Sequence, residues 1–389
     1  MGRLIIGSKG FSWFKKGHPW IFRNDLEKVE DAAPGFIVSL EKKNGEFLGQ
    51  GFYSDRSKIA FRLISRSKEP VGREFWKRRL QQADEYRKTV VRDANAYRMV
   101  YAESDGVPSL IIDRYGDHFV LQTLSQGTDQ LTFLFAELLS ELFRPSSIIL
   151  RNDLSVRELE GLPQEKKVFQ GDCPADLQVF EGGVKYSVDL WTGQKTGAFL
   201  DQRENRHAAS RLLRGKILDA FCYHGLFSLH SAQNATRVIG VDSSPEAIDR
   251  AKANARLNGF TNVEFQKENV FDFLKRQDGE GDTYDGIILD PPAFAKSKGD
   301  IRAAIRGYKE LNLRAIRLLN PGGILVTCSC SYNLSEPEFV EMLRDSAKDA
   351  RSPMRIVEKR GQSADHPVLL SFPESYYLKC LFLQKIFTS

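Results

Sequence analysis

The sequence is poor in cysteine and contains no long hydrophobic run. Its 389 residues include five cysteines, an odd and sparse set with no Cys-x-x-Cys pair, so neither a disulfide framework nor a zinc site is indicated. No apolar run approaches the roughly 20 residues that cross a bilayer, and the first residues lack the hydrophobic core of a signal peptide. We therefore expect a soluble protein of the reducing cytoplasm, with no metal and no membrane partner.

The chain also lacks internal repeats and low-complexity tracts. Hydrophobic residues make up 41% and charged residues 28%, which suffices for ordinary folded cores and excludes global disorder. Because a typical domain has about 150 residues, the length predicts two or three domains.

Positive charge is concentrated near the N-terminus. The formal charge is +5, but residues 1–80 hold 17 Lys and Arg against 9 Asp and Glu, a balance of +8, which leaves −3 for the rest. Neutralised phosphates are the main sequence-independent source of nucleic-acid affinity, so this basic head favours a polyanionic partner. A solvated basic surface with no partner is the alternative.

The first part of the chain is typical of short strands. Gly35–Leu40 and Glu46–Tyr53 alternate apolar with polar or glycine positions around the turn at Asn44-Gly45, and Ile59–Ile64 follows as a third strand. Helical periodicity is weak here, so we predict a small β-barrel domain over residues 1–70.

The middle of the chain mixes both periodicities. It predicts a helix over Arg73–Lys88, two strands within Gly106–Leu124 and a helix over Thr128–Phe143, before a turn-rich segment at Gly161–Gly183. We assign residues 71–185 to a central α+β domain.

From about residue 190 strand and helix patterns alternate, which is typical of a mostly parallel sheet covered by helices. The predicted strands are Lys216–Phe221, Arg237–Asp242, Val263–Gln266, Tyr284–Asp290 and Gly323–Cys328. Ser244-Pro245-Glu246 begins a helix that ends at Asn258-Gly259. The predicted fold class is therefore α/β, with a Rossmann-like domain over residues 186–389.

The loop after the first of these strands indicates a small cofactor. It runs from Asp219 to Ser228 and holds one glycine, Gly225, instead of the three in Gly-x-Gly-x-x-Gly, so a pyrophosphate cofactor is poorly supported. Asp242 ends the next strand, where a carboxylate can accept hydrogen bonds from both ribose hydroxyls. A strand-end aspartate that caps the following helix is the alternative.

A third acid follows the fourth strand, in the motif Asp290-Pro291-Pro292-Ala293-Phe294. Two prolines cannot continue a central strand, so the chain leaves the sheet there in a fixed shape. Such a motif can present its acid to a ring nitrogen while the aromatic stacks on a flipped base, and a purely structural turn is the alternative. Together with the one-glycine loop and the ribose acid, it resembles the class I S-adenosylmethionine-dependent methyltransferases.

The following strand ends at Cys328-Ser-Cys330. Alternation places both cysteines on one face, with Cys330 nearer the catalytic edge. A thiolate there can add to carbon 6 of cytosine while Asp290 serves nitrogen 3, which makes carbon 5 nucleophilic enough to take a methyl group. The base that removes the carbon-5 proton is not identifiable. A buried, inert cysteine is the alternative for Cys330, and packing is the better assignment for Cys328.

Motifs along nearly the whole chain carry a closer resemblance. They are Gly17-His-Pro-Trp-Ile-Phe22, Trp191–Arg206, Asp219-Ala-Phe-Cys-Tyr, Asp290-Pro-Pro-Ala-Phe, Cys328-Ser-Cys-Ser, Asp365-His-Pro-Val and Pro373–Lys379. In these motifs the chain resembles the bacterial 23S ribosomal RNA cytosine-5 methyltransferases. The resemblance implies an N-terminal PUA domain, a central α+β domain and a methyltransferase domain with a seven-stranded sheet.

The resemblance also implies S-adenosylmethionine as cofactor and Cys330 as the nucleophile, with Asp290 its catalytic partner. The residues expected at the cofactor are Gln202, Asp219, Phe221, Tyr223, Gly225, Asp242, Ser243, Asn269 and Asp290. Two positions depart from the family: Leu226 stands where a second glycine is common, and Asn269 where an aspartate often meets the adenine amino group. The oxygen of Asn269 can still accept that hydrogen bond.

The implied partner is 23S ribosomal RNA or its large-subunit precursor. The residues expected at RNA are Lys15, Lys16, Trp20, Arg23, Arg203 and Phe294. A core position for Trp20, and a bracing role beside Asp201 for Arg203 and Arg206, are the alternatives. Two other functions stay open, a purine N-methyltransferase and an inactive RNA-binding assembly factor, as does the oligomeric state, with a homodimer among the options.

Overall fold

The structure is a computed structural model that describes residues 2–294 and 298–386. The chain divides into two compact units, and each is described by itself. The first comprises Met1–Val179, Val188–Leu200 and Ala364–Ser375, and the second comprises Phe180–Ser187, Asp201–Ser363 and Tyr376–Ser389. The chain thus passes between the units five times, and the predicted domain boundaries at residues 70 and 185 stay predictions.

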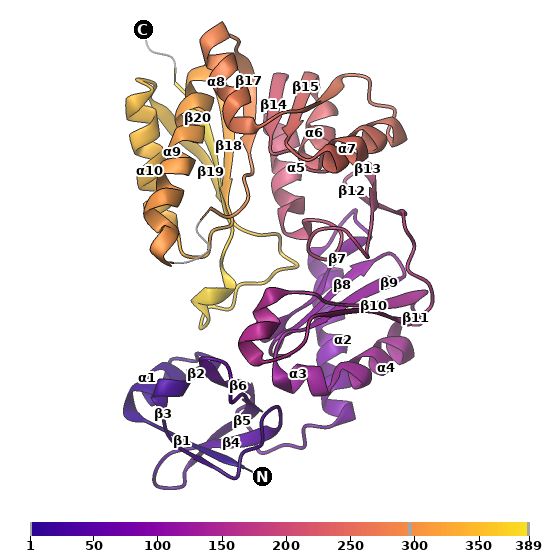
Figure 1. Cartoon of the computed structure of the whole chain (residues 1–389), viewed down its shortest axis with the longest axis vertical. Coiled ribbons are helices and arrows are strands. Elements are labelled where there is room, and N and C mark those ends of the chain that lie inside the picture. Colours follow the sequence, from indigo (N-terminus) through magenta and orange to yellow (C-terminus); the bar gives the residue numbers. More distant parts are fainter. Residues whose placement is uncertain (1, 295–297, 387–389) are drawn as a thin grey trace. The chain divides into compact units, whose positions relative to one another are not determined.

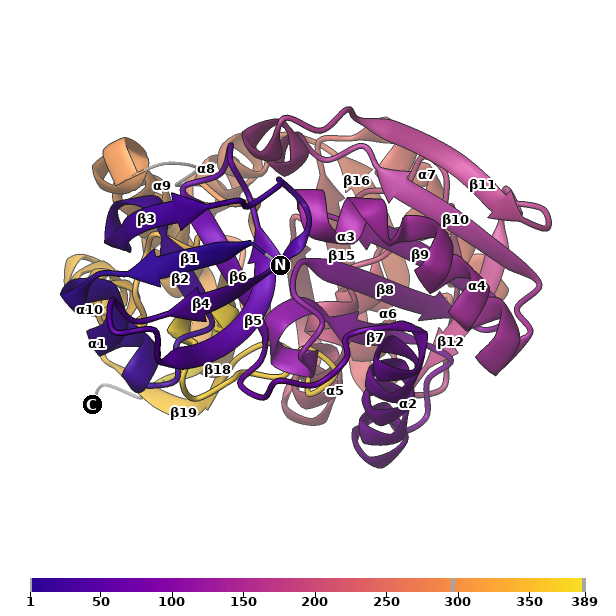
Figure 2. The same cartoon turned by 90° about the horizontal axis from the view of Figure 1, so that it is seen from below.

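The first unit begins with a six-stranded sheet in the order β2-β6-β5-β4-β1-β3 (Figure 2). Its elements are β1 (Arg3–Ile6), α1 (Ser8–Lys15), β2 (Trp20–Phe22), β3 (Leu26–Glu30), β4 (Ile37–Glu41), β5 (Phe47–Tyr53) and β6 (Ile59–Ser65). The three strands predicted here correspond to β4, β5 and β6, which pair as consecutive antiparallel neighbours. Helix α1 was not predicted, because its eight residues are too few to show a clear period; it buries Phe14 in the core beneath the sheet.

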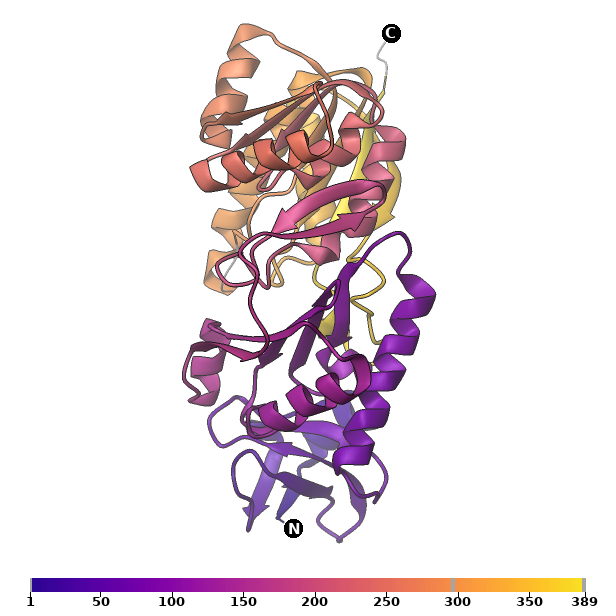
Figure 3. The same ribbon diagram turned by 90° about the vertical axis from the view of Figure 1, so that its right-hand side faces the viewer.

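A five-stranded sheet follows, in the order β11-β10-β9-β8-β7. Its elements are α2 (Arg73–Val90), β7 (Ala96–Tyr101), β8 (Leu110–Tyr115), β9 (His118–Thr123), α3 (Gln126–Gln130), α4 (Thr132–Phe143), β10 (Ser147–Asn152) and β11 (Glu165–Gln170). Figure 3 shows the helices of this part lying beside the sheet. Trp76 of α2 and Phe135 of α4 are buried together against it. The helices therefore cover one face of it.

One expectation for this part was wrong, and two of its strands were not predicted. The single helix expected over Thr128–Phe143 is broken at Leu131, where the Thr132 hydroxyl donates to the Asp129 carbonyl and so competes with the helical ladder. The turn-rich segment Gly161–Gly183 also contains two strands, β11 and β12 (Leu177–Glu181). β11 is nearly all polar or half-exposed, so hydrophobic alternation does not reveal it.

The second unit is built on a seven-stranded sheet in the order β16-β15-β14-β17-β18-β20-β19. Its strands are β14 (Gly215–Ala220), β15 (Ala235–Asp242), β16 (Val263–Lys267), β17 (Tyr284–Leu289), β18 (Leu319–Ser329), β19 (Met354–Arg360) and β20 (Lys379–Lys385). The first five pair in parallel, while β20 runs antiparallel to β18 and β19. The predicted seven-stranded, mostly parallel sheet is confirmed.

Helices cover both faces of this sheet (Figure 1). They are α5 (Arg203–Leu212), α6 (Leu226–Ala232), α7 (Pro245–Leu257), α8 (Val270–Glu280), α9 (Ile301–Leu318) and α10 (Glu336–Asp349); a hairpin of β12 and β13 (Val184–Val188) precedes α5. Along β14, Ile217 packs with residues of α5 and α6, whereas Leu218 packs with residues of α8, α9 and α10. This alternation explains why the central strands are apolar throughout. No helix among residues 2–294 and 298–386 is both long and apolar enough to span a bilayer.

Candidate active site

Three carboxylates meet at the carboxyl edge of the seven-stranded sheet. Asp219 lies near the end of β14, Asp242 ends β15 and Asp290 directly follows β17. β14 lies between β15 and β17 and is parallel to both, so the three acids share one edge at the point where the strand order reverses. The predicted grouping of these acids is therefore present in the fold.

Asp219 is the most deeply buried of the three, with 0% of its surface exposed. Its Oδ2 accepts a hydrogen bond of 2.6 Å from the Ser228 hydroxyl, and within the described residues its Oδ1 has no hydrogen-bond partner. Burial raises the pKa of Asp219 to about 7, and the charges of Asp290 and Asp242 add to the rise against the effect of Ser228. The carboxyl thus lacks the cation that a buried carboxylate normally requires.

The loop after β14 is held in a tight shape by Asp242. Its Oδ2 accepts a 3.0 Å hydrogen bond from the Tyr223 amide, and its Oδ1 accepts one of 2.9 Å from the Ser244 amide. Phe221 and Tyr223 adopt positive φ angles of 69° and 49°, which side chains of this size rarely adopt. Asp242 therefore organises this loop, and its half-exposed carboxylate keeps further acceptor capacity for a ligand.

Gly225 closes the loop and is sterically required there. Its φ is +80°, and a Cβ at this position would lie 2.7 Å from Cζ of Phe265, against the ring that fills the space below the loop. Any other residue would push α6 away from the sheet. The single glycine noted in the sequence is therefore the one that the fold needs.

These residues fit S-adenosylmethionine. The cofactor carries an ammonium group and a sulfonium group, and the edge offers three acids, one of them buried with a carboxylate oxygen that lacks a partner. Ser243 is exposed next to Asp242, and Phe221 and Tyr223 are half-exposed in the loop. Asp219, Asp242 and this loop are the residues that would hold the cofactor.

Asn269, the residue expected at adenine, has a structural role at the start of α8. The residue is exposed and forms the N-cap of α8, where its side-chain oxygen accepts hydrogen bonds from the amides of Phe271, at 2.9 Å, and Asp272, at 3.4 Å. Both lone pairs of that oxygen are thus used by the helix. The next residues of α8 include Phe271, whose ring centre lies 6.5 Å from that of Phe221 and 6.2 Å from that of Phe294.

Gln202 contacts Asp290 and is itself held in place. Its Nε2 donates to Oδ1 of Asp290 at 2.9 Å, while its own oxygen accepts from Nδ2 of Asn205 at 2.6 Å. Both amide side chains are buried. Gln202 therefore orients the Asp290 carboxylate, and the cofactor contact expected of it stays a prediction.

The two cysteines after Thr327 lie in different surroundings. Cys328 is fully buried in β18 opposite Cys380 of β20; burial, together with Cys380, raises the pKa of its thiol well above the usual value. β18 ends at Ser329, so Cys330 lies beyond the strand and is half-exposed. The alternation argument that placed both thiols on one face does not apply, because Cys330 is not part of the strand.

The residues expected at RNA divide into two groups. Lys15 and Lys16 are exposed at the end of α1, and Phe294 is half-exposed with its ring 4.7 Å from that of Tyr308. Arg23 instead donates to the carbonyls of Ser54 and Ser57 at 2.9 and 2.7 Å. The three candidates with structural roles are Trp20, Arg23 and Arg203.

Trp20 is half-buried, and its Nε1 donates a hydrogen bond of 2.8 Å to Glu103. The centre of its ring lies 4.5 Å from that of Phe372. Arg203 is only 1% exposed, so we no longer assign it to RNA phosphate. Trp13, which the sequence analysis did not single out, is 51% exposed, and the centre of its ring lies 5.4 Å from Nζ of Lys16. The two tryptophans therefore differ in their exposure to solvent, and composition alone does not reveal that difference.

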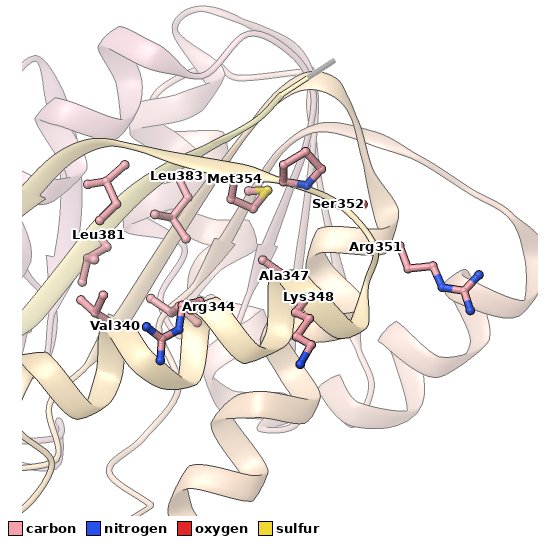
Figure 4. A pocket seen from close by; sticks show the side chains of 12 residues that line it. Val340, Arg344, Ala347, Lys348, Arg351, Ser352, Met354, Leu381 and Leu383 are labelled. Carbon is pink, nitrogen blue, oxygen red and sulfur yellow. The ribbon is translucent and has the colours of Figure 1, made fainter. Parts of the chain in front are cut away.

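A groove of about 460 Å³ lies elsewhere in the second unit, between α10 and the strands β19 and β20 (Figure 4). Apolar side chains such as Val340, Leu381 and Leu383 line it, together with Arg344, Lys348 and Arg351. None of the residues predicted for cofactor or RNA lines it. The groove is therefore separate from the candidate active site.

Two family models match the chain. A PUA-like domain matches residues 4–66 and a methyltransferase domain matches residues 214–369. A solved structure from Streptococcus mutans, described provisionally as a SAM-dependent methyltransferase, superposes with a TM-score of 0.84 at 22% identity and covers 99% of this chain and 100% of its own. Together they confirm the predicted fold class, a PUA-like N-terminal domain and a C-terminal class I methyltransferase fold.

Relatives in sequence cover nearly the whole chain. The ribosomal RNA large subunit methyltransferase I of Aeromonas hydrophila subsp. hydrophila is 40% identical over 377 residues, which are 94% of this chain and 95% of that protein. The protein of the same name from Tolumonas auensis is 40% identical over 379 residues, which are 95% and 96% of the two chains. The similarity therefore includes both the basic head and the sheet edge that carries the three acids.

Proposed function

Because the chain belongs to the ribosomal RNA large subunit methyltransferase I family, we propose that it transfers a methyl group from S-adenosylmethionine to carbon 5 of a cytosine in large-subunit ribosomal RNA. One observation supports the choice of atom. Asp290 and Cys330 follow neighbouring parallel strands, β17 and β18, in which Leu289 is paired with Thr327. An acid and a half-exposed thiol are thus brought to the same edge as the cofactor acids.

The residues suit the chemistry of a poor carbon nucleophile. The Cys330 thiolate forms a bond to carbon 6, the electrons of the 5,6 double bond pass through the ring to nitrogen 3, and Asp290 gives nitrogen 3 a proton. S-adenosylmethionine, when bound, would supply the methyl group from its sulfonium centre. Carbon 5 would take this methyl group. Loss of the carbon-5 proton to a base then restores the 5,6 double bond and expels the Cys330 thiolate, while nitrogen 3 returns its proton to Asp290.

The substrate is expected to be 23S ribosomal RNA or its precursor, which places the protein in the cytoplasm. The PUA-like head would hold structured RNA by contacts to phosphate and shape, while Phe294 stacks on the one unstacked base. Asp219, Asp242, Ser243 and the loop from Phe221 to Gly225 would hold the cofactor.

Nucleoside analysis tests the proposal. The purified chain is incubated with large-subunit RNA and isotopically labelled S-adenosylmethionine, and the digested RNA is separated by mass spectrometry. We expect the label in 5-methylcytidine. Label in an N-methylated purine would replace this proposal by purine methylation, and the absence of both label and cofactor binding would indicate an inactive assembly factor.

Removing charge from the end of α1 is expected to weaken RNA binding without affecting the cofactor. Lys15→Gln together with Lys16→Gln should lower the slope of log affinity against log salt by about 2, since each phosphate contact contributes about 1. Filter binding across a salt series measures this slope. Lys252→Gln with Lys275→Gln removes the same charge from exposed positions of α7 and α8; an equal loss in that control would contradict a specific role for α1.

A further inference from the structure

One lysine of the second unit lies beside the chain that carries the candidate nucleophile. Lys379 begins β20, is only 3% exposed and is paired with Ser329 across the antiparallel β18–β20 ladder. Its Nζ donates to the Ser331 carbonyl at 2.7 Å and to the Tyr377 carbonyl at 2.8 Å. The ammonium is thus fixed against the backbone carbonyl of Ser331, the residue that follows Cys330, and these two contacts use two of its three protons.

Several ionisable groups surround this ammonium. Burial lowers the pKa of Lys379 to about 8, while negative charge on Cys330, Glu336 and Glu338 acts in the opposite direction. Tyr308 of α9 also faces this region, because its hydroxyl contacts the Ser329 and Ser331 hydroxyls at 3.1 and 3.0 Å. Negative charge on Cys330 therefore affects the ionisation of Lys379, and by reciprocity the positive charge of the lysine affects the ionisation of the thiol.

The two glutamates have partners of their own. Glu336 accepts from Lys359 Nζ at 2.8 Å and from the Tyr376 hydroxyl at 3.0 Å. Glu338 forms the capping box of α10, where it accepts from the amide and hydroxyl of Ser335 at 2.8 and 2.6 Å. Neither acid therefore depends on Lys379 for compensation.

We propose that Lys379 is a positioning residue that holds Cys330 as a thiolate and fixes the turn on which it lies. This inference rests on the nucleophilic role of Cys330 in the proposed function. An opposite charge a few ångströms from a titratable group typically favours its charged form by one to three pKa units. The thiolate is the form that attacks, so the lysine would raise the fraction of reactive protein at neutral pH.

A purely structural role for the lysine is the competing explanation, and the chain offers a matched control. Lys385, at the other end of β20, donates to the Ile316 and Leu319 carbonyls at 3.0 and 2.7 Å. Burial lowers its pKa as well, and no thiol contributes to that shift. Lys385 is half-exposed, so Lys385→Gln removes a less buried lysine anchor of the same strand without touching Cys330.

The test measures thiol reactivity in the full chain without RNA, so it is independent of which nucleoside is made. Iodoacetamide alkylation of the Cys330 peptide is followed by mass spectrometry from pH 5.5 to 9.5, with the half-exposed Cys173 as an internal reference. Lys379→Gln, which keeps a donor but no charge, should slow alkylation of Cys330 about tenfold at pH 7 and move its profile about one unit upward. Lys379→Arg, which keeps the charge, should retain most of the wild-type rate.

The remaining outcomes contradict the proposal. Equal slowing in the glutamine and arginine variants would reduce Lys379 to a structural anchor, as would equal slowing by Lys385→Gln. An unchanged profile in Lys379→Gln would show that the ammonium does not stabilise the thiolate. Affinity for S-adenosylmethionine, measured by calorimetry on each variant, confirms that the protein remains folded.

Discussion

Replacing Cys330 by alanine is expected to abolish methyl transfer to RNA, with a loss on the order of a thousandfold or more, while S-adenosylmethionine still binds. The size follows from the loss of the nucleophile, since without a carbon–sulfur bond at carbon 6 carbon 5 does not become reactive. The cofactor acids belong to β14, β15 and the segment after β17, so the substitution leaves them in place. Transfer of labelled methyl groups and calorimetry of cofactor binding measure the two effects separately.

Cys328→Ala is the matched control for this prediction. The side chain is fully buried opposite Cys380, so its loss should cost stability by about 1 kcal/mol and leave the rate of methyl transfer nearly unchanged. RNA that carries 5-fluorocytosine adds a direct readout, because the adduct has no carbon-5 proton to lose and stays bound to the wild-type chain. Full activity in Cys330→Ala, or a trapped adduct in that variant, would contradict the mechanism.

Local sequence patterns predict most of the seven-stranded sheet. Tyr284–Leu289 is an apolar run that ends at two prolines, and Pro245 with Ser244 begins α7 with a proline in its first turn and a side-chain cap. Such signals act over a few residues, so the sequence carries them directly. The three acids could be grouped for the same reason, since parallel strands bring their carboxyl ends to one edge.

The parts that the sequence did not predict depend on contacts between distant residues. β19 ends at Arg360 and β20 begins at Lys379, and the segment Ala364–Ser375 between these two paired strands belongs to the first unit. Lys379 and Ser331 are 48 positions apart, and only the β18–β20 pairing brings them together. Trp20 and Arg203 belong to residue types common at RNA interfaces, but their burial follows from partners such as Phe372 that no local pattern indicates.

The affinity for S-adenosylmethionine is expected to depend strongly on pH because of Asp219. Burial raises the pKa of this carboxyl to about 7, so in the free protein it is largely protonated below that pH. A cationic ligand favours the carboxylate, and binding must therefore expel a proton. Affinity should fall about tenfold for each pH unit below 7 and level off above it. Calorimetry from pH 5.5 to 8.5, in buffers with different ionisation enthalpies, measures both the affinity and the released proton.

Asp219→Asn separates this charge from the shape of the site, because the amide oxygen can still accept from Ser228. The variant should bind the cofactor more weakly at pH 8 and lose the pH dependence, whereas Asp242→Asn should bind weakly and keep it.

Although Asp219→Asn should weaken cofactor binding, it should make the ligand-free protein more stable at pH 8. A pKa raised from 3.8 to about 7 on folding means that the wild-type carboxyl costs folding free energy progressively as pH rises from about 4 to 7. The ligand-free asparagine variant should therefore melt at a higher temperature than the wild type at pH 8, and a lower one would show that Asp219 has a buried cationic partner of its own.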